Sequence, residues 1–414
     1  MNTYQQRRKK YQDAMKDNSM AFLYSGDEAE SSHDECFAFE VYRNFYYLTG
    51  VDTPKAIYLV FKVAGVVSET LLMHTPTEHE QRWSGIKFDI DELKEKTGIS
   101  AIRPLEDWED VVSRGLFGSG VKDCYMDMAR WRMSYPYNGE QKLAHQLLKA
   151  YPYLTMHNSY ETVAQMRTVK TPEEIAAHRK ACLITEQAVK NMLDNIKPGM
   201  MEYEVEAYYD FVLKSNGVMT PAFPTIAAGG INACYMHYMR NNSRLADGDM
   251  ILFDLGARWD YYCADVSRTY PVNGKFTARQ KELYNVVLAG LNAALEATKP
   301  GQPKDELQNI SKQVMAQELM KLKMIETPEE ISKYYFHGSG HFIGLDTHDV
   351  GANGMTLAKD MVFTLEPGLY FDDEKIGIRI EDTILITEDG KEVLSGGIPK
   401  TVEEIEAYMS RRKG

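Results

Sequence analysis

The sequence predicts an α/β (α+β) protein of two domains, and three observations lead to this fold class. Hydrophobic residues make up 44% and charged residues 26% of the 414 residues, which is typical of a globular chain. Helix-like and strand-like segments alternate over roughly the first 160 residues. After Gly217 the pattern changes to strands and turns with Gly and Asp between them. We expect the domains at residues 1–165 and 166–414.

The first domain is expected to combine short helices with buried strands. The helices are expected at residues 4–16, 89–97 and 141–150, and the strands at 20–24 and 56–67. Trp83, Trp108 and Trp131 are interpreted as packing residues, because no polar residues converge around them in the sequence.

A new helix is expected at the start of the second domain. Thr171 suits the N-cap, Pro172 the first helical position, and Glu173 and Glu174 the positive end of the helix dipole. Further helices are expected between Gly199 and Gly217, at 278–297 and at 304–322.

The charge balance and the apolar runs exclude several functional classes. The chain carries 47 Lys and Arg against 60 Asp and Glu, a net charge of −13, which disfavours nucleic acid and anionic membranes as partners. The longest apolar stretch, residues 56–67, contains Lys62 and is far shorter than the roughly 20 residues of a membrane-spanning helix. No apolar segment follows the basic residues near the start, so we expect a cytoplasmic protein.

Four carboxylates lie on apolar, strand-like segments, where a globular chain normally avoids charge. Asp254 and Asp265 are on consecutive segments joined by a turn at residues 258–260, and a hairpin would bring them together. Glu366 and Glu381 repeat this paired-strand arrangement later in the chain.

Four ionised carboxylates around one cavity need a compensating charge, because like charges repel strongly where water is excluded. A single carboxylate on a strand is more often an ion-pair partner of Arg. Four carboxylates with one imidazole, however, form an oxygen-rich ligand set that suits Mn²⁺ or Co²⁺ and, less selectively, Zn²⁺. Two such ions about 3.5–4 Å apart can activate a water against a carbonyl or phosphoryl group.

A histidine-rich run, His337-Gly-Ser-Gly-His341 followed by His348, lies between the two pairs of carboxylate segments. The spacing of the first two histidines resembles half of a zinc-protease helix motif, but no Glu follows the first histidine and two glycines intervene. We therefore expect both on a loop or strand. With His237, these are the four histidines near the carboxylates, and the other six are interpreted as surface or structural residues.

These segments together resemble the dinuclear Xaa-Pro peptidases, aminopeptidase P and prolidase. The similar motifs are Asp254-Leu-Gly-Ala, Asp265-Val-Ser-Arg-Thr-Tyr, His337 to Gly351, Leu365-Glu366-Pro-Gly-Leu-Tyr370 and Gly377-Ile-Arg379-Ile-Glu381-Asp382. They occur in the order of the family and cover the whole second half of the chain. A weaker similarity, Val41-Tyr-Arg-Asn-Phe-Tyr-Tyr-Leu-Thr-Gly50, extends into the first half.

The resemblance implies five ligands for two divalent ions, expected to be Mn²⁺, with Co²⁺ or Zn²⁺ as alternatives. Asp265 and Glu381 would bridge the ions, Asp254 would hold one of them, and His341 with Glu366 would hold the other.

The resemblance also implies the catalytic and substrate-binding residues. Glu366 would act as general base, and His348 would donate to the developing oxyanion. His237 would lie near the scissile bond and His337 would line the proline-side pocket. Arg379 with Tyr370 would orient the carboxylates, and Tyr370 is also expected at the substrate.

The implied fold is a creatinase/prolidase-like α/β domain followed by a pita-bread catalytic domain, and the implied assembly is a homodimer. Departures from the family pattern are Ala264, where Gly is frequent, and Ser267, where Thr is usual. Gly340 is closer to many prolidases than to aminopeptidases P.

The leading hypothesis is a metal-dependent Xaa-Pro aminopeptidase that acts on proline-containing peptides through a two-metal-activated hydroxide. Prolidase, which cleaves Xaa-Pro dipeptides only, is the alternative. A catalytically inactive peptide-binding or histone-binding member and a metal-free creatinase-like hydrolase are disfavoured, because all five expected ligands are present. A two-metal phosphoesterase lacks support from a basic cluster or a phosphate-binding loop.

Overall fold

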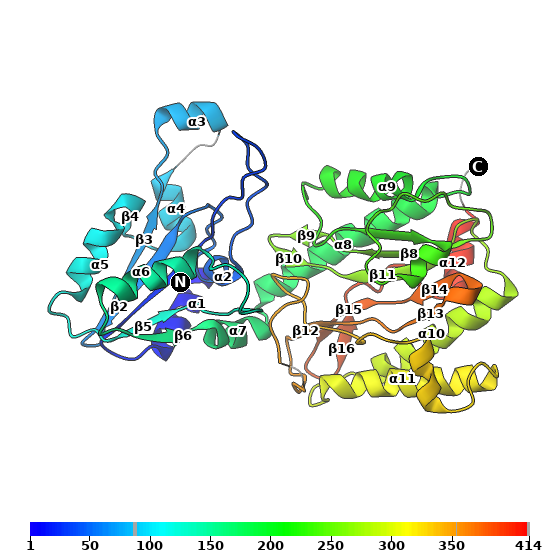
Figure 1. Ribbon diagram of the computed structural model, residues 1–414. Coiled ribbons are helices and arrows are strands. Elements are labelled where there is room, and N and C mark those ends of the chain that lie inside the picture. Colours follow the sequence, from blue (N-terminus) through cyan, green and yellow to red (C-terminus); the bar gives the residue numbers. More distant parts are fainter. Residues whose placement is uncertain (86–88, 353, 412–414) are drawn as a thin grey trace. The chain divides into compact units, whose positions relative to one another are not determined.

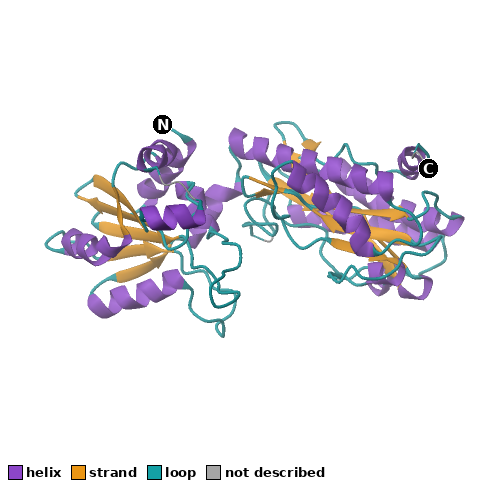
Figure 2. Ribbon diagram, turned by 90° about the horizontal axis from the view of Figure 1, so that it is seen from above, coloured by secondary structure: helices purple, strands orange, loops and turns teal. Residues whose placement is uncertain are grey.

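The computed structural model describes residues 1–85, 89–352 and 354–411 and forms two compact units, Met1–Arg167 and Thr168–Gly414 (Figure 1). Figure 2 shows that each unit combines strands with flanking helices. Among the described residues, no helix has both the length and the apolar character needed to cross a membrane.

The first unit contains one mixed six-stranded sheet with the strand order β4-β3-β2-β1-β5-β6. Strands β1, β5 and β6 are parallel to one another, whereas β2 is antiparallel to both of its neighbours. The elements of this unit are α1 (Thr3–Ala14), β1 (Ser19–Tyr24), α2 (Arg43–Thr49), β2 (Ile57–Val63), β3 (Val66–Met73), α3 (Glu78–Ser84), α4 (Ile90–Thr97), β4 (Ile102–Pro104), α5 (Trp108–Leu116), β5 (Asp123–Met126), α6 (Gly139–Ala150), β6 (Thr155–Asn158) and α7 (Tyr160–Thr168).

The predicted single strand at residues 56–67 is wrong, because the segment contains a turn between β2 and β3. Ala64 and Gly65 both have positive φ, at 50° and 76°, and Val63 pairs with Val66 across them. Two central residues of positive φ are the geometry of a type I′ hairpin turn. The turn lies within an apolar run and was therefore hidden in the hydrophobic pattern.

Of the three tryptophans interpreted as packing residues, one packs against the sheet. Trp108 packs edge to face against Phe22, with 5.5 Å between ring centroids. Trp83 and Trp131 are 86% and 84% exposed. Trp83 stacks on His79 within α3, a helix whose described residues include no buried side chain.

The second unit begins with the predicted capped helix: the Thr171 hydroxyl accepts from the Glu174 amide, and Pro172 opens α8. Its elements are α8 (Pro172–Asn195), α9 (Glu202–Ser215), β7 (Ile226–Gly229), β8 (Met250–Leu255), β9 (Arg258–Trp259), β10 (Tyr262–Cys263), β11 (Val266–Pro271), α10 (Ala278–Ala297), α11 (Lys304–Lys321), β12 (Val362–Leu365), β13 (Gly368–Phe371), β14 (Ile376–Arg379), β15 (Asp382–Ile386), β16 (Lys391–Val393) and α12 (Val402–Met409). The helices expected at 278–297 and 304–322 are confirmed as α10 and α11.

Antiparallel pairing joins the strands of the second unit, with the orders β11-β8-β7, β12-β15-β16 and β13-β14. The predicted hairpin is present, since β8 pairs with β11 and Asp254 lies opposite Ser267. The strand-like segment that carries Asp265 is not one continuous strand. It breaks after Cys263 into β10 and β11, because β10 pairs with β9 whereas β11 pairs with β8. Helices α8 and α10 bury apolar faces in the core beneath these strands.

Candidate metal centre

The four predicted carboxylates lie near strand ends or between consecutive strands. Asp254 is the penultimate residue of β8, and Asp265 lies between β10 and β11. Glu366 lies between β12 and β13, and Glu381 between β14 and β15. Because β12 pairs with β15 while β13 pairs with β14, the chain changes its pairing partner at both glutamates. The irregular backbone at these breaks allows side chains from separate strands to meet.

One cavity of about 490 Å³ contains all four carboxylates in its wall. The predicted residues His237, His341, His348 and Arg379 also line it. The remaining lining residues are Phe223, Pro224, Ile226, Met236, Met239, Asp346 and Thr347. The structure therefore brings together eight of the ten residues that the sequence singled out, and leaves His337 and Tyr370 outside the lining.

His341 directs its Nε2 atom toward the carboxylates. Its Nδ1 lies 3.1 Å from the Phe342 carbonyl oxygen, to which a ring N–H must donate, so in the neutral ring Nε2 carries no proton. This Nε2 lies 3.3 Å from Asp265 Oδ2 and 3.9 Å from Glu366 Oε1. A ring nitrogen at these distances from carboxylate oxygens requires a proton or a metal cation between the nitrogen and the oxygens.

Asp265, His341 and Glu381 offer ligand atoms that all lie within 4.8 Å of one another. Asp265 Oδ1 and Glu381 Oε1 are buried, and the described residues provide no hydrogen-bond partner for either. Burial raises the pKa of both carboxyls, and so do neighbouring carboxylates: Glu381 acts on Asp265, and Asp254 on Glu381. Burial and Glu381 also raise the pKa of Glu366. Buried, unpartnered oxygens in a set of repelling carboxylates fit divalent cations.

Arg379 is the fixed positive charge of the site, and its side chain is 2% exposed. Nη2 donates to Asp254 Oδ2 over 2.7 Å, Nη1 to the Tyr370 hydroxyl over 3.0 Å, and Nε to Ser267 Oγ over 2.8 Å. One planar guanidinium therefore connects strands β8, β11, β13 and β14.

Ser267 is a site residue that was not assigned a role from the sequence. Its hydroxyl accepts from Arg379 Nε and donates to Glu381 Oε2 over 2.9 Å, which fixes one oxygen of that carboxylate and leaves the other unpartnered. Its position two residues after Asp265 could have indicated a place in the site, because alternate residues of a strand lie on the same face.

Tyr370 and His337 continue the hydrogen-bond chain behind Arg379. Since the Tyr370 hydroxyl accepts from Arg379, its own proton is free to donate to His337 Nε2, 3.0 Å away. His337 Nδ1 donates to the Gly338 carbonyl oxygen over 2.6 Å. Burial and the charge of Arg379 lower the pKa of His337 to about 4, which matches this neutral ring.

His348 and His237 lie on the more exposed side of the cavity. The His348 ring stands edge to face against His341, with centroids 4.3 Å apart. Partial desolvation lowers the pKa of His348, and the nearby His341 and His237 add to this effect. A neutral ring at physiological pH can donate a hydrogen bond to a substrate oxygen without introducing a full charge.

Part of the cavity lining is an apolar wall. It consists of Phe223, Pro224, Ile226, Met236 and Met239. Sequence reasoning missed these side chains, because no local pattern separates them from ordinary core residues.

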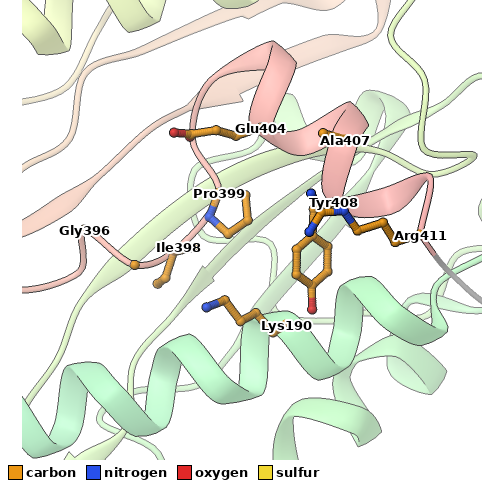
Figure 3. A pocket seen from close by; sticks show the side chains of 9 residues that line it. Lys190, Gly396, Ile398, Pro399, Glu404, Ala407, Tyr408 and Arg411 are labelled. Atoms are coloured by element: carbon orange, nitrogen blue, oxygen red, sulfur yellow. The ribbon is translucent and has the colours of Figure 1, made fainter.

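A second hollow lies elsewhere on this unit, between α8 and α12, and its lining includes Lys190, Tyr408 and Arg411 (Figure 3). Among its described lining residues, Glu404 is the sole carboxylate and no histidine occurs. Lys190 forms an ion pair with Glu186 over 2.6 Å. This hollow lacks the ligand set of the first cavity.

Comparisons with known proteins agree with this geometry. Residues 176–388 match the family described as "Metallopeptidase family M24", and residues 4–122 match "Aminopeptidase P, N-terminal domain". The Xaa-Pro aminopeptidase of Escherichia coli (strain K12) is 32% identical over 432 residues, which cover 98% of this chain and 97% of that protein.

Solved structures are similar over the whole chain. A putative aminopeptidase P from Bacillus anthracis superposes with a TM-score of 0.97 and 40% identity, covering 99% of this chain and 98% of that one. Zn-substituted E. coli aminopeptidase P in complex with product has a TM-score of 0.91 and 31% identity, covering 100% and 99%. The E. coli enzyme with the inhibitor Pro-Leu has a TM-score of 0.91 and 31% identity, covering 99% and 98%.

Proposed function

This chain belongs to the aminopeptidase P family of M24 metallopeptidases, and we propose that it removes the N-terminal residue from peptides whose second residue is proline. The predicted fold, an α/β N-terminal domain followed by a pita-bread catalytic domain, is confirmed by the same relatives. The observation that carries the proposal is the cluster of Asp265, His341 and Glu381 in one cavity with Asp254 and Glu366.

The proposed ligands of two divalent cations are Asp254, Asp265, His341, Glu366 and Glu381. The oxygen-rich set favours Mn²⁺, with Co²⁺ and Zn²⁺ as alternatives. When bound, the cations supply a water of lowered pKa and polarise the scissile carbonyl. The orphaned oxygens of Asp265 and Glu381 support this assignment, and so does the position of His341 Nε2 beside Asp265 and Glu366.

Side chains of this protein then accept and donate the protons of the reaction. The Glu366 carboxylate accepts a proton from the attacking water and passes it to the proline nitrogen as the bond breaks. His348 donates a hydrogen bond to the carbonyl oxygen as it gains negative charge. His237, on the same side of the cavity, is proposed to lie next to the scissile bond.

The acidic cavity suits an N-terminal amine, and the chemistry of proline explains why a dedicated site is needed. The Xaa-Pro amide has no N–H, so peptidases that bind an extended backbone lose a hydrogen bond there. The apolar wall of Phe223, Ile226 and Met236 offers contacts to an uncharged part of the substrate. His337 and Tyr370, proposed from the sequence as substrate contacts, are better assigned to the support of Arg379.

The test is hydrolysis of Ala-Pro and Ala-Pro-Ala, each with Mn²⁺ and with a chelator. Metal-dependent release of alanine from the tripeptide is expected. Cleavage of the dipeptide alone would assign the protein as a prolidase, and no metal-dependent cleavage of either peptide would overturn the proposal. The homodimer and the cytoplasmic location remain predictions.

A further inference from the structure

The loop that carries His337 and His341 is attached to strand β12 on one side. The His341 amide donates to Thr364 Oγ1 over 3.2 Å, and the Thr364 amide donates to the His341 carbonyl oxygen over 2.8 Å. The Glu366 amide donates to the Ser339 carbonyl oxygen over 3.0 Å. The positions of two proposed ligands, His341 and Glu366, therefore depend on these hydrogen bonds between the loop and residues 364–366.

Gly340 makes this contact possible. Its φ of +151° is unfavourable for other residues, and a Cβ at this position would lie 1.9 Å from the Thr364 carbonyl oxygen. The loop thus passes β12 too closely for any side chain at position 340.

A lysine from a different element holds the other side of the loop. Lys304, the first residue of α11, donates from Nζ to the Gly340 carbonyl oxygen over 3.0 Å. Its ammonium lies 5.9 Å from the centroid of the Phe342 ring. Lys304 therefore contacts the residues immediately before and after His341. Residues of α11, the loop and β12 together line a small cavity of about 10 Å³.

The placement of Lys304 opposes the local preferences of a helix. A cation at a helix N-terminus is disfavoured by the helix dipole, and the Lys304 side chain is only 12% exposed. The neighbouring Asp305 carboxylate is 3.6 Å away, and its own side chain is 52% exposed. Residues that break a local rule in this way often serve a functional site.

We propose that Lys304 is a positioning residue that holds the His337–His341 loop, and with it the imidazole of His341, in the geometry required for a divalent cation. This role rests on the proposed function, because it presupposes that His341 is a metal ligand. It acts through the backbone on either side of the ligand and not through contact with the substrate.

The test is a Co²⁺ titration of the metal-free protein, followed by visible absorption and by calorimetry. Lys304→Met should weaken Co²⁺ binding by about 10–100-fold, the usual loss when a group that orients a ligand is removed. The Tm of the metal-free protein should stay equal or rise, because the unfavourable charge at the helix N-terminus is gone. Lys304→Arg, which can still donate to the Gly340 carbonyl oxygen, should recover most of the affinity and the wild-type absorption spectrum. Lys321→Met, an exposed change in the last turn of α11, is the matched control and should bind as the wild type does.

The outcomes separate the two proposals. Equal Co²⁺ affinity and equal spectra for the wild type and Lys304→Met would overturn the role of Lys304 and leave the metallopeptidase assignment standing. A wild type that binds no Co²⁺ would overturn both. If Lys304→Met lowers the Tm of the metal-free protein, the Lys304→Arg variant, with a normal Tm, provides the decisive comparison. Recovered Co²⁺ affinity in Lys304→Arg supports the proposal. Co²⁺ affinity as weak as in Lys304→Met overturns it.

Discussion

Arg379 Nη2 and Asp254 Oδ2 lie 2.7 Å apart, and the two side chains are 2% and 17% exposed. The same guanidinium also donates to Tyr370 and Ser267, so its orientation is determined by three partners at once. A proposed metal ligand is thereby held by a side chain that never changes its charge at physiological pH.

Substitution of Arg379 by Lys should reduce metal affinity or kcat by about 10–100-fold, although the positive charge is retained. A lysine ammonium lacks the planar arrangement that reaches Asp254, Tyr370 and Ser267 together. The measurement is the Kd for Mn²⁺ and the kcat at saturating Mn²⁺. Wild-type values for both would show that charge alone is sufficient at this position.

Ser267 should depend on its hydroxyl and tolerate an added methyl group. Ser267→Ala removes the link between Arg379 and Glu381 and should weaken metal binding by about 10–100-fold. Ser267→Thr keeps the hydroxyl and should bind Mn²⁺ nearly as the wild type does. The idea fails if the two variants have the same Kd for Mn²⁺.

Glu366→Gln should nearly abolish peptide cleavage, with a loss of roughly 10²–10⁴ in kcat for the proton transfer alone. The amide is close in size to the carboxylate but cannot accept the proton from water. The assay is Ala-Pro-Ala hydrolysis at saturating Mn²⁺, with Glu388→Gln, an exposed partner of Lys359, as the control. Near-normal turnover by Glu366→Gln would show that Glu366 is not the general base.

The free energy of unfolding should fall as the pH decreases from about 6.5 toward 3, in part because of His178. This ring is fully buried and donates from Nδ1 to the Cys263 carbonyl oxygen. Burial, aided by the charge of Lys170, lowers its pKa to about 3. Within this window the unfolded chain binds a proton at His178 that the folded protein does not, so acid favours unfolding.

The contribution of His178 is at most about 1.4 kcal/mol per pH unit. Denaturant unfolding of the wild type and His178→Gln, compared between pH 6.5 and pH 5, should show a smaller slope for the variant. Identical slopes would mean that the ring takes up a proton in the folded state.

Local signals allowed several elements to be predicted from the sequence. The N-cap Thr171 with Pro172, and the periodic apolar residues of α10, are encoded within a few neighbouring positions, and the structure has them as expected. The turn at Ala64 and Gly65 was missed because its residues continue an apolar run. Trp83 and Trp131, interpreted as packing residues, are exposed, since size and apolar character alone do not place a side chain in the core.

The sequence by itself determined the family, the fold and the types of residue available for chemistry, because these depend on residue identity, order and short-range spacing. Only the tertiary structure decided where the strands break at Asp265, Glu366 and Glu381, which oxygens remain unpartnered, and how Arg379 is held. It also showed the contacts of Ser267 and Lys304, which join residues more than 30 positions apart. Such contacts depend on which strands and helices pack together, and no local pattern of residues encodes that choice.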